Sequence, residues 1–283
     1  MEDEQIAKLS ALRAEIDETD DKIHDLLMHR AWLAEQIGAV KKDSPDFKNV
    51  VRPAREIEIL RRLWHRHQGA FDRRVVMKIW REIICGCVNL QKPMTVAVHM
   101  PKSDCKNMEV AKHYFGSFTE YVPCKSESLV LKELTQGDSN IGVFSLGAKD
   151  TCWWYAMAQQ YKMSLSVFAC LPFVEAEPYA PVRPVYAVGR FPAEETGDDI
   201  SLLFMQTDGT LSLSTLDLIL KTAGLETLTV CDTFTPDLSC KAYLFEVKGF
   251  VTKDDGRLGD VAKKEAEKIQ MLRVIGSFPV PLK

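Results

Sequence analysis

The fold is decided by residues 9–42, which read LSALRAEIDETDDKIHDLLMHRAWLAEQIGAVKK. Apolar side chains recur here at the alternating three- and four-residue spacing of a coiled-coil seam. The seam positions are Leu9, Leu12, Ile16, Thr19, Ile23, Leu26, Arg30, Leu33, Ile37 and Val40. At 1.5 Å per residue such a helix spans about 55–60 Å, more than two shorter helices of the same segment can cover. We therefore expect it to pack along the same helix of a second chain in a homodimer.

Arg30 is the charged residue of this seam, where an unpaired guanidinium carries a desolvation penalty of several kcal/mol. No acidic residue occupies a seam position, so we expect an anionic ligand to meet the charge. Lys41 lies about three turns further on and projects from nearly the same face. Arg13 is roughly 25 Å from Arg30 along the axis and can approach it only from the partner chain of an antiparallel pair. These cations predict a site shared between two chains.

Two further helices are expected in the same segment. One begins with Pro53, a favourable first-turn residue, and ends at Gly69. The next takes Asp72 as its N-cap and ends at Gln91. Residues 1–92 are thus predicted to form an all-α, three-helix domain.

Four side chains of these two helices extend the candidate site. Arg52 and Arg55 flank the start of the second helix, and Cys87 lies one turn before Gln91 on one face of the third. Taken singly, each is explained more simply as a surface charge or a helix-end residue. Their joint placement with Arg30 favours a binding site.

After residue 93 the pattern changes to short strand-like runs separated by helical stretches. The expected strands are 95–99, 141–146, 165–170 and 185–188, and the expected helices are 107–114 and 126–134. This pattern predicts a small α/β lobe over residues 94–192. Residues 199–283 follow the order strand, helix, strand, strand, helix, strand, which is ferredoxin-like. Its elements are expected at 200–206, 214–223, 227–233, 241–251, 258–271 and 272–278.

The composition narrows the class of protein. With 46% hydrophobic residues, 27% charged residues and a net charge of -4, the chain is typical of soluble globular proteins and not of polybasic nucleic-acid binders. Its eight cysteines include no CxxC pair, so we expect reduced thiols and no metal site. No apolar run approaches the roughly 20 residues of a membrane span, and the first residues lack a signal-peptide pattern. We expect a cytoplasmic protein.

The first ninety residues resemble the helical, AroQ-class chorismate mutases. The resemblance is carried by residues 12–20 (LRAEIDETD), residues 26–34 (LLMHRAWLA), Lys41, the pair Arg55-Glu56 and Gln91. It implies an intertwined dimer in which Arg30 and the partner's copy of Arg13 hold substrate carboxylates. It further implies that Lys41 and Gln91 bond the ether oxygen, and that Arg55 and Glu56 complete the pocket.

Two positions depart from the family pattern. Arg52 stands where many members carry an acid near the start of the second helix, and Cys87 stands in place of a serine. Both are kept as candidate substrate-binding positions. The reaction implied, chorismate to prephenate, is intramolecular and needs no cofactor, metal or nucleophile, because an enzyme can hold the compact conformer and stabilise charge on the ether oxygen.

The α/β lobe resembles a prephenate dehydratase domain that lacks its middle. Residues 96–98 (VAV), Pro101, residues 109–116 (EVAKHYFG) and the pair Gly189-Arg190 carry the likeness. Where that family has a Thr-Arg-Phe motif, residues 183–185 read RPV. The resemblance therefore implies a single lobe without dehydratase activity.

The C-terminal module resembles an ACT domain, a ferredoxin-like unit that binds amino-acid effectors. Residues 200–204 (ISLLF), 209–211 (GTL), 228–233 (LTVCDT) and 274–279 (VIGSFP) carry the match. By resemblance, an aromatic amino-acid effector would lie near Gly209, Leu211, Asp232 and Thr233. Phe234-Thr235 replaces the family's Arg-Pro, so phenylalanine binding is weighed against a structural or dimerising role.

The sequence leaves three functions to compare. A metal-free, cofactor-free chorismate mutase is favoured because its cation set is intact. A non-catalytic regulatory protein of the aromatic pathway and a bifunctional mutase and prephenate dehydratase are the alternatives.

Overall fold

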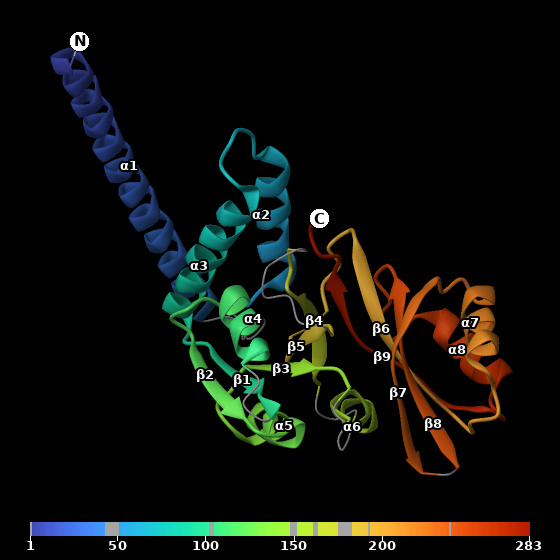
Figure 1. Ribbon diagram of the computed structural model, residues 1–283. Coiled ribbons are helices and arrows are strands. Elements are labelled where there is room, and N and C mark those ends of the chain that lie inside the picture. The colour runs from blue at the N-terminus through green and yellow to red at the C-terminus, as the bar shows by residue number, and fades with distance from the viewer. Residues whose placement is uncertain are drawn as a thin grey trace.

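The computed structural model describes residues 2–42, 51–101, 105–147, 152–160, 164–174, 183–191, 193–237 and 239–283. It begins with three helices, α1 (Glu2–Lys42), α2 (Pro53–Arg66) and α3 (Arg73–Gln91). Figure 1 shows α1 projecting away from the rest of the chain, with its C-terminal end beside α3. The three-helix prediction for this segment is confirmed.

The helix ends follow from local backbone chemistry. Pro53 occupies the first turn of α2, and the Asp72 carboxylate caps α3 by accepting the N–H of Arg74 at 2.8 Å. The second helix was expected to run to Gly69, which is wrong. It ends at Arg66 because His67 turns the backbone into an extended conformation, with φ -64° and ψ 130°.

An α/β region follows the helices. Its strands are β1 (Thr95–His99), β2 (Glu120–Cys124), β3 (Ile141–Ser145), β4 (Ser166–Leu171) and β5 (Val185–Gly189), and its helices are α4 (Lys106–Phe115), α5 (Glu127–Gln136) and α6 (Trp153–Gln159). β1 is parallel to β2 and β3, whereas β5 is antiparallel to β3 and β4. The sequence did not predict β2 or α6. β2 contains Pro123, and α6 is a short, aromatic-rich helix whose residues favour strands.

The C-terminal region has the expected βαββαβ order. Its elements are β6 (Asp199–Thr207), α7 (Leu213–Thr222), β7 (Thr227–Asp237), β8 (Cys240–Lys248), α8 (Gly256–Lys264) and β9 (Ile269–Pro279). The four strands lie in the order β9-β6-β8-β7 with antiparallel neighbours. The second helix was expected to reach Met271, but it ends at Lys264 because β9 already begins at Ile269.

The two sheet regions, expected as separate modules, share one continuous sheet. Its order is β2-β1-β3-β5-β4-β9-β6-β8-β7, and β4 meets β9 in parallel through Val167 and Gly276. A Cβ on Gly276 would lie 2.2 Å from the Val167 carbonyl oxygen. Only glycine therefore allows the two strands to approach so closely.

The sheet bends so that its two halves face each other across a buried core. The Tyr186 hydroxyl of β5 donates to the Glu246 carboxylate of β8 at 2.8 Å, although three strands separate them in the sheet order. Phe144, Tyr186 and Phe204 belong to this core. A second core joins α2 and α3 to α4 and the first half of the sheet. A third lies beneath α7 and α8, which cover the outer face of the C-terminal strands (Figure 1).

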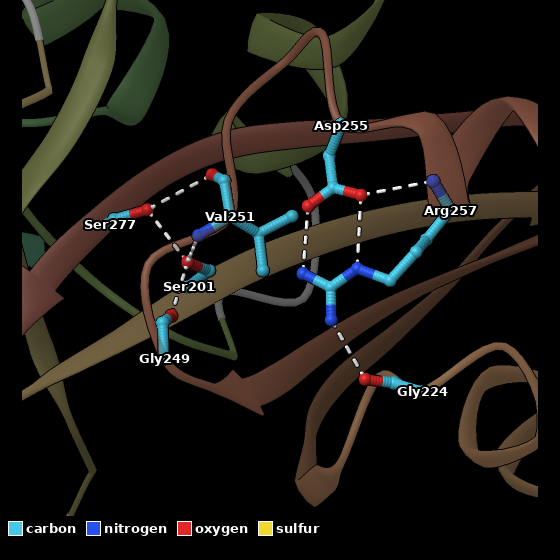
Figure 2. Close-up of polar contacts among 7 residues, drawn as sticks. All are labelled: Ser201, Gly224, Gly249, Val251, Asp255, Arg257 and Ser277. Carbon is cyan, nitrogen blue, oxygen red and sulfur yellow. Dashed lines mark hydrogen bonds and ion pairs between the residues drawn. The ribbon is translucent and has the colours of Figure 1, made fainter.

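Buried hydroxyls fix the turn that follows β8. Figure 2 shows Ser201, in β6, donating to the Gly249 carbonyl at 2.7 Å and accepting the Val251 N–H at 2.8 Å. Its Oγ also lies 2.7 Å from that of Ser277 in β9. These bonds satisfy backbone groups of the turn that the sheet ladder leaves open.

Neither a membrane-crossing helix nor a cluster of metal ligands occurs in the described part of the chain. None of the described helices combines the length and hydropathy that a bilayer crossing requires. No group of three or more metal-ligating side chains occurs in the described part of the chain.

Candidate active site

The Arg30 guanidinium lies in the contact between α1 and α3. Its Nη1 donates to the Cys87 thiol at 2.8 Å and to the Ile83 carbonyl at 3.3 Å, and the side chain is partly buried. No carboxylate pairs with it in the described part of the chain. The structure thus brings together Arg30 and Cys87, which the sequence placed on different helices. It leaves the guanidinium's charge without an anionic partner.

Gln91 lies one turn after Cys87, at the end of α3. Its Nε2 donates to the Cys87 carbonyl at 3.2 Å, whereas its Oε1 is buried without a hydrogen-bond partner. A buried polar atom without a partner is uncommon, and this acceptor is available to a donor group of a ligand. Arg30, Cys87 and Gln91 therefore form one polar cluster where α1 crosses α3.

Gly38 is a site-forming residue that the sequence argument missed. A Cβ on Gly38 would lie 3.1 Å from Gln91 Cγ, so the missing side chain lets α1 approach Gln91 closely. A glycine inside a helix costs about 1 kcal/mol relative to alanine. A glycine inside a helix, at a position between Arg30 and Lys41, is the feature of the sequence that could have indicated this close approach.

The half-buried Lys41 lies near the start of α2. Burial lowers the pKa of its ammonium, the Arg52 guanidinium lowers it further, and the Glu194 carboxylate raises it. Arg52 donates to Glu194 through Nε at 2.8 Å. Glu194 belongs to the segment that precedes β6, and no sequence pattern pointed to it.

The α2 residues Arg55 and Glu56 have partners within the chain. Arg55 is exposed and pairs with Glu58 at 2.6 Å. Glu56 is buried and accepts from Arg81 of α3 at 2.9 Å. Arg81 also donates to the Tyr114 carbonyl at 2.7 Å. Arg81 is a charged residue on an apolar helix face, with Met77 and Cys85, and this pattern could have indicated it in the same way as Arg30.

Arg13 is an exposed residue of α1, the helix that projects away from the rest of the chain (Figure 1). It is about 25 Å from Arg30 along the helix axis, so one chain does not bring the two together. The apolar seam residues beside it are exposed in the single chain, with Leu12 at 49%, Ile16 at 59% and Leu26 at 68%.

The candidate effector positions are split between two places. Gly209, with φ +79°, and the half-buried Leu211 follow β6. Asp232 and Thr233 lie in β7, two strands away in the sheet order. The Asp232 carboxylate accepts from the Trp154 indole of α6 at 3.2 Å. Asp232 is thus already bonded to the α/β region.

Residues 12–92 match the family described as chorismate mutase type II. The match covers most of α1 and all of α2 and α3. The helical segment is therefore a chorismate mutase type II domain, and it carries every candidate catalytic residue.

Two relatives are named bifunctional chorismate mutase/prephenate dehydratase. The protein from Stutzerimonas stutzeri is 32% identical over 139 residues and that from Aquifex aeolicus is 35% identical over 138 residues. Each match covers 48% of this chain and 38% of the relative. The match thus spans less than two fifths of the relatives' own length.

Among solved structures, prephenate dehydratase from Streptococcus mutans is similar over 66% of this chain and 99% of that chain. The TM-score is 0.43 and the identity is 14%. At that level the likeness adds nothing to the assignment.

Proposed function

We propose that this protein is a chorismate mutase that rearranges chorismate to prephenate in aromatic amino-acid biosynthesis. The observation that carries the proposal is Arg30, a partly buried guanidinium held beside Cys87 on the opposing helix, to which no described residue offers a carboxylate. A dianionic substrate would supply the missing negative charge. The match of residues 12–92 to the type II family supports the same reading.

The proposed mechanism needs positioning and charge stabilisation only. Arg30 would bind a substrate carboxylate, and Lys41 and Gln91 would donate to the ether oxygen as its bond breaks. Such preorganised donors stabilise the charge that develops in the transition state. Holding the substrate in its reactive conformer lowers the barrier further, and the two effects together lower it by roughly 4–10 kcal/mol. Gln91 can take this donor role through Nε2, which carries two N–H donors, one of which bonds the Cys87 carbonyl at 3.2 Å. The reaction requires no cofactor.

We propose that the site is completed by a second chain. The exposed apolar stripe of α1 would be buried against the same helix of the partner, and each fully buried large apolar side chain contributes about 1.5–3 kcal/mol. In an antiparallel pair, Arg13 of one chain falls near Arg30 and Lys41 of the other. Arg52, Arg55, Glu56 and Cys87 remain proposed substrate-binding positions. We expect the dimer to work in the cytoplasm.

A chorismate-consumption assay tests the proposal. Wild-type protein should consume chorismate, and Arg30→Ala should lower kcat/KM by about 10²- to 10³-fold, the range for losing a preorganised charge-stabilising donor. Arg62→Ala, an exposed arginine of α2, is the matched control and should retain activity. Equal activity of both variants would remove Arg30 from the mechanism.

We propose that the chain lacks dehydratase activity. Residues 183–185, at the place of the family's Thr-Arg-Phe motif, read RPV, and the Arg183 side chain contacts the Leu146 carbonyl at 3.4 Å. Incubating the protein with prephenate should therefore yield no phenylpyruvate. Formation of phenylpyruvate above the uncatalysed rate would favour a bifunctional enzyme, as the relatives' names describe.

We propose that the ACT-like C-terminal unit has a structural role. Asp232 is engaged by Trp154, and Tyr155 contacts Phe234 with ring centroids 5.1 Å apart, so this segment is used to join the unit to α6. Phenylalanine should then leave the melting temperature unchanged. A saturable rise in melting temperature with phenylalanine would instead show an effector site.

A further inference from the structure

The segment that links the α/β region to β6 is bound by two arginines of the mutase domain. Arg61 of α2 donates to the Thr196 carbonyl at 2.7 Å, to the Thr196 hydroxyl at 3.0 Å and to the Asp198 carbonyl at 2.7 Å. Arg52, one residue before α2, donates to Glu194 at 2.8 Å. Residues 193–198, here called the linker, are therefore bonded to α2 at Arg61 and to Arg52, just before the helix begins.

The part of the linker that Arg61 binds is also bonded to the C-terminal sheet. The carboxylate of Asp199, the buried first residue of β6, accepts from the Thr196 N–H at 2.8 Å and the Thr196 hydroxyl at 2.7 Å. It also accepts the Gly197 N–H at 3.1 Å. Arg61 and Asp199 hold residues 196–198, and the bond from Arg52 places Glu194 beside the start of α2.

Glu194 is more than an exposed partner for Arg52. Its side chain is 23% exposed, against 45% for Arg52, and its Oε2 is buried with no hydrogen-bond partner. The carboxylate lies close enough to Lys41 to act on that ammonium. A partly desolvated carboxylate is stabilised by nearby cations, and here those cations are Arg52 and Lys41.

We propose that Glu194 is a positioning residue of the mutase site, which holds Arg52 and offsets its charge next to Lys41. This inference rests on the proposed mutase function. Many members of the family that the helical segment resembles carry an acid near the start of the second helix, where this chain has Arg52. Glu194 supplies a carboxylate beside Arg52 from a segment more than a hundred residues later in the chain. The mutase site would then depend on residues outside the three helices.

The pH dependence follows from the charges that act on Lys41. Two charged side chains of the described residues, Arg52 and Glu194, influence it and act in opposite directions. Lys41 must be protonated to donate to the substrate. Removal of the Glu194 carboxylate takes away an interaction that raises the Lys41 pKa, so we expect that pKa to fall. Activity should then be lost at a lower pH than in the wild type.

The test compares Glu194→Gln with Glu195→Gln, which neutralises an adjacent exposed carboxylate. Full-length variants are assayed for kcat and KM between pH 6 and pH 10, about the range in which a perturbed lysine titrates. We expect Glu194→Gln to lower kcat/KM about three- to tenfold at neutral pH and to move the basic limb to lower pH. Arg52→Gln/Glu194→Gln should move that limb back up. Glu195→Gln should match the wild type.

A readout that does not need catalysis separates this inference from the proposed function. The Lys41 ammonium is titrated by NMR in the wild type and in both single variants, with melting temperature as the folding check. A lower Lys41 pKa in Glu194→Gln alone supports the inference even if no chorismate is consumed. Identical Lys41 titration and identical pH profiles in the two single variants would overturn it. If Glu194→Gln fails to fold, Arg52→Gln is used, which removes the charge that lowers the Lys41 pKa. A Lys41 pKa that does not rise in that variant also overturns the inference.

Discussion

The guanidinium of Arg81 in α3 stacks on the ring of Tyr114 in α4, with 3.9 Å between Cζ and the ring centroid. The same guanidinium bonds the buried Glu56 of α2. One side chain therefore ties two mutase helices to the α/β region. It also holds Glu56, a proposed substrate-binding residue, in a buried ion pair.

Arg81→Met should destabilise the protein strongly. Removing one member of a buried ion pair leaves the other charge uncompensated, which costs about 3–5 kcal/mol. Urea denaturation measures the change, with Arg62→Met as the exposed control. Glu56→Leu/Arg81→Met should recover part of the loss, because no buried charge is left unpaired. A loss for Arg81→Met no larger than that of the control would show that the pair is not buried as described.

Gly38→Ala should reduce mutase activity while leaving the fold intact. The added Cβ meets Gln91 Cγ at 3.1 Å, so the amide must move away from α1. We expect kcat/KM to fall about tenfold, since small displacements of positioning groups lower rates by such factors. Gly86→Ala is the matched control, because no atom lies within 4 Å of a Cβ at that helical position. Equal activity of the two variants would contradict the close approach.

Gly276→Ala should disrupt the junction between the two halves of the sheet. A Cβ there would lie 2.2 Å from the Val167 carbonyl oxygen and 2.4 Å from its nitrogen. Such an overlap with backbone cannot be relieved by rotating a side chain, so we expect a loss of more than about 4 kcal/mol or failure to fold. Gly259→Ala, where a Cβ meets no atom within 4 Å, should be neutral or slightly stabilising. A neutral Gly276→Ala would refute the continuous sheet.

Buried thiols should make the protein less stable in alkali. Burial raises the pKa of Cys85 to about 11 and that of Cys170 to about 12. The unfolded chain ionises its thiols near pH 8.5, so it binds fewer protons than the folded chain above that pH. Stability should fall as pH rises from about 8.5 towards 11. Cys85→Ala/Cys170→Ala should flatten this dependence in urea denaturation, and an unchanged slope would count against the raised pKa of the two thiols.

The sequence predicted the elements whose residues share one clear pattern. The 3,4 spacing of α1, the Asp72 cap and the strand-helix order after residue 199 depend on local chemistry, and all three appear in the structure. A polar partner for Arg30 could also be predicted, because a partly buried arginine on an apolar seam has to meet a polar group. These features can be deduced without knowing how the elements pack.

What the sequence could not supply arises from contacts between distant segments. Glu194 reaches Arg52 across 142 positions, and Tyr186 reaches Glu246 across 60. Neither pair leaves a local periodic signal. The β4 to β9 link depends on a single glycine, Gly276, and glycine also occurs in ordinary turns. The α6 helix was missed because its tryptophans and tyrosine favour strands when packing is ignored.

The most direct measurement of the central claim mixes Arg13→Ala chains with Arg30→Ala chains after joint unfolding and refolding. If each pocket uses Arg30 of one chain and Arg13 of the other, a mixed dimer has one intact pocket. Random pairing then restores about a quarter of wild-type activity from two inactive variants. Recovery near that level would support a shared mutase site. A mixture that forms mixed dimers and stays as inactive as its parents would contradict it.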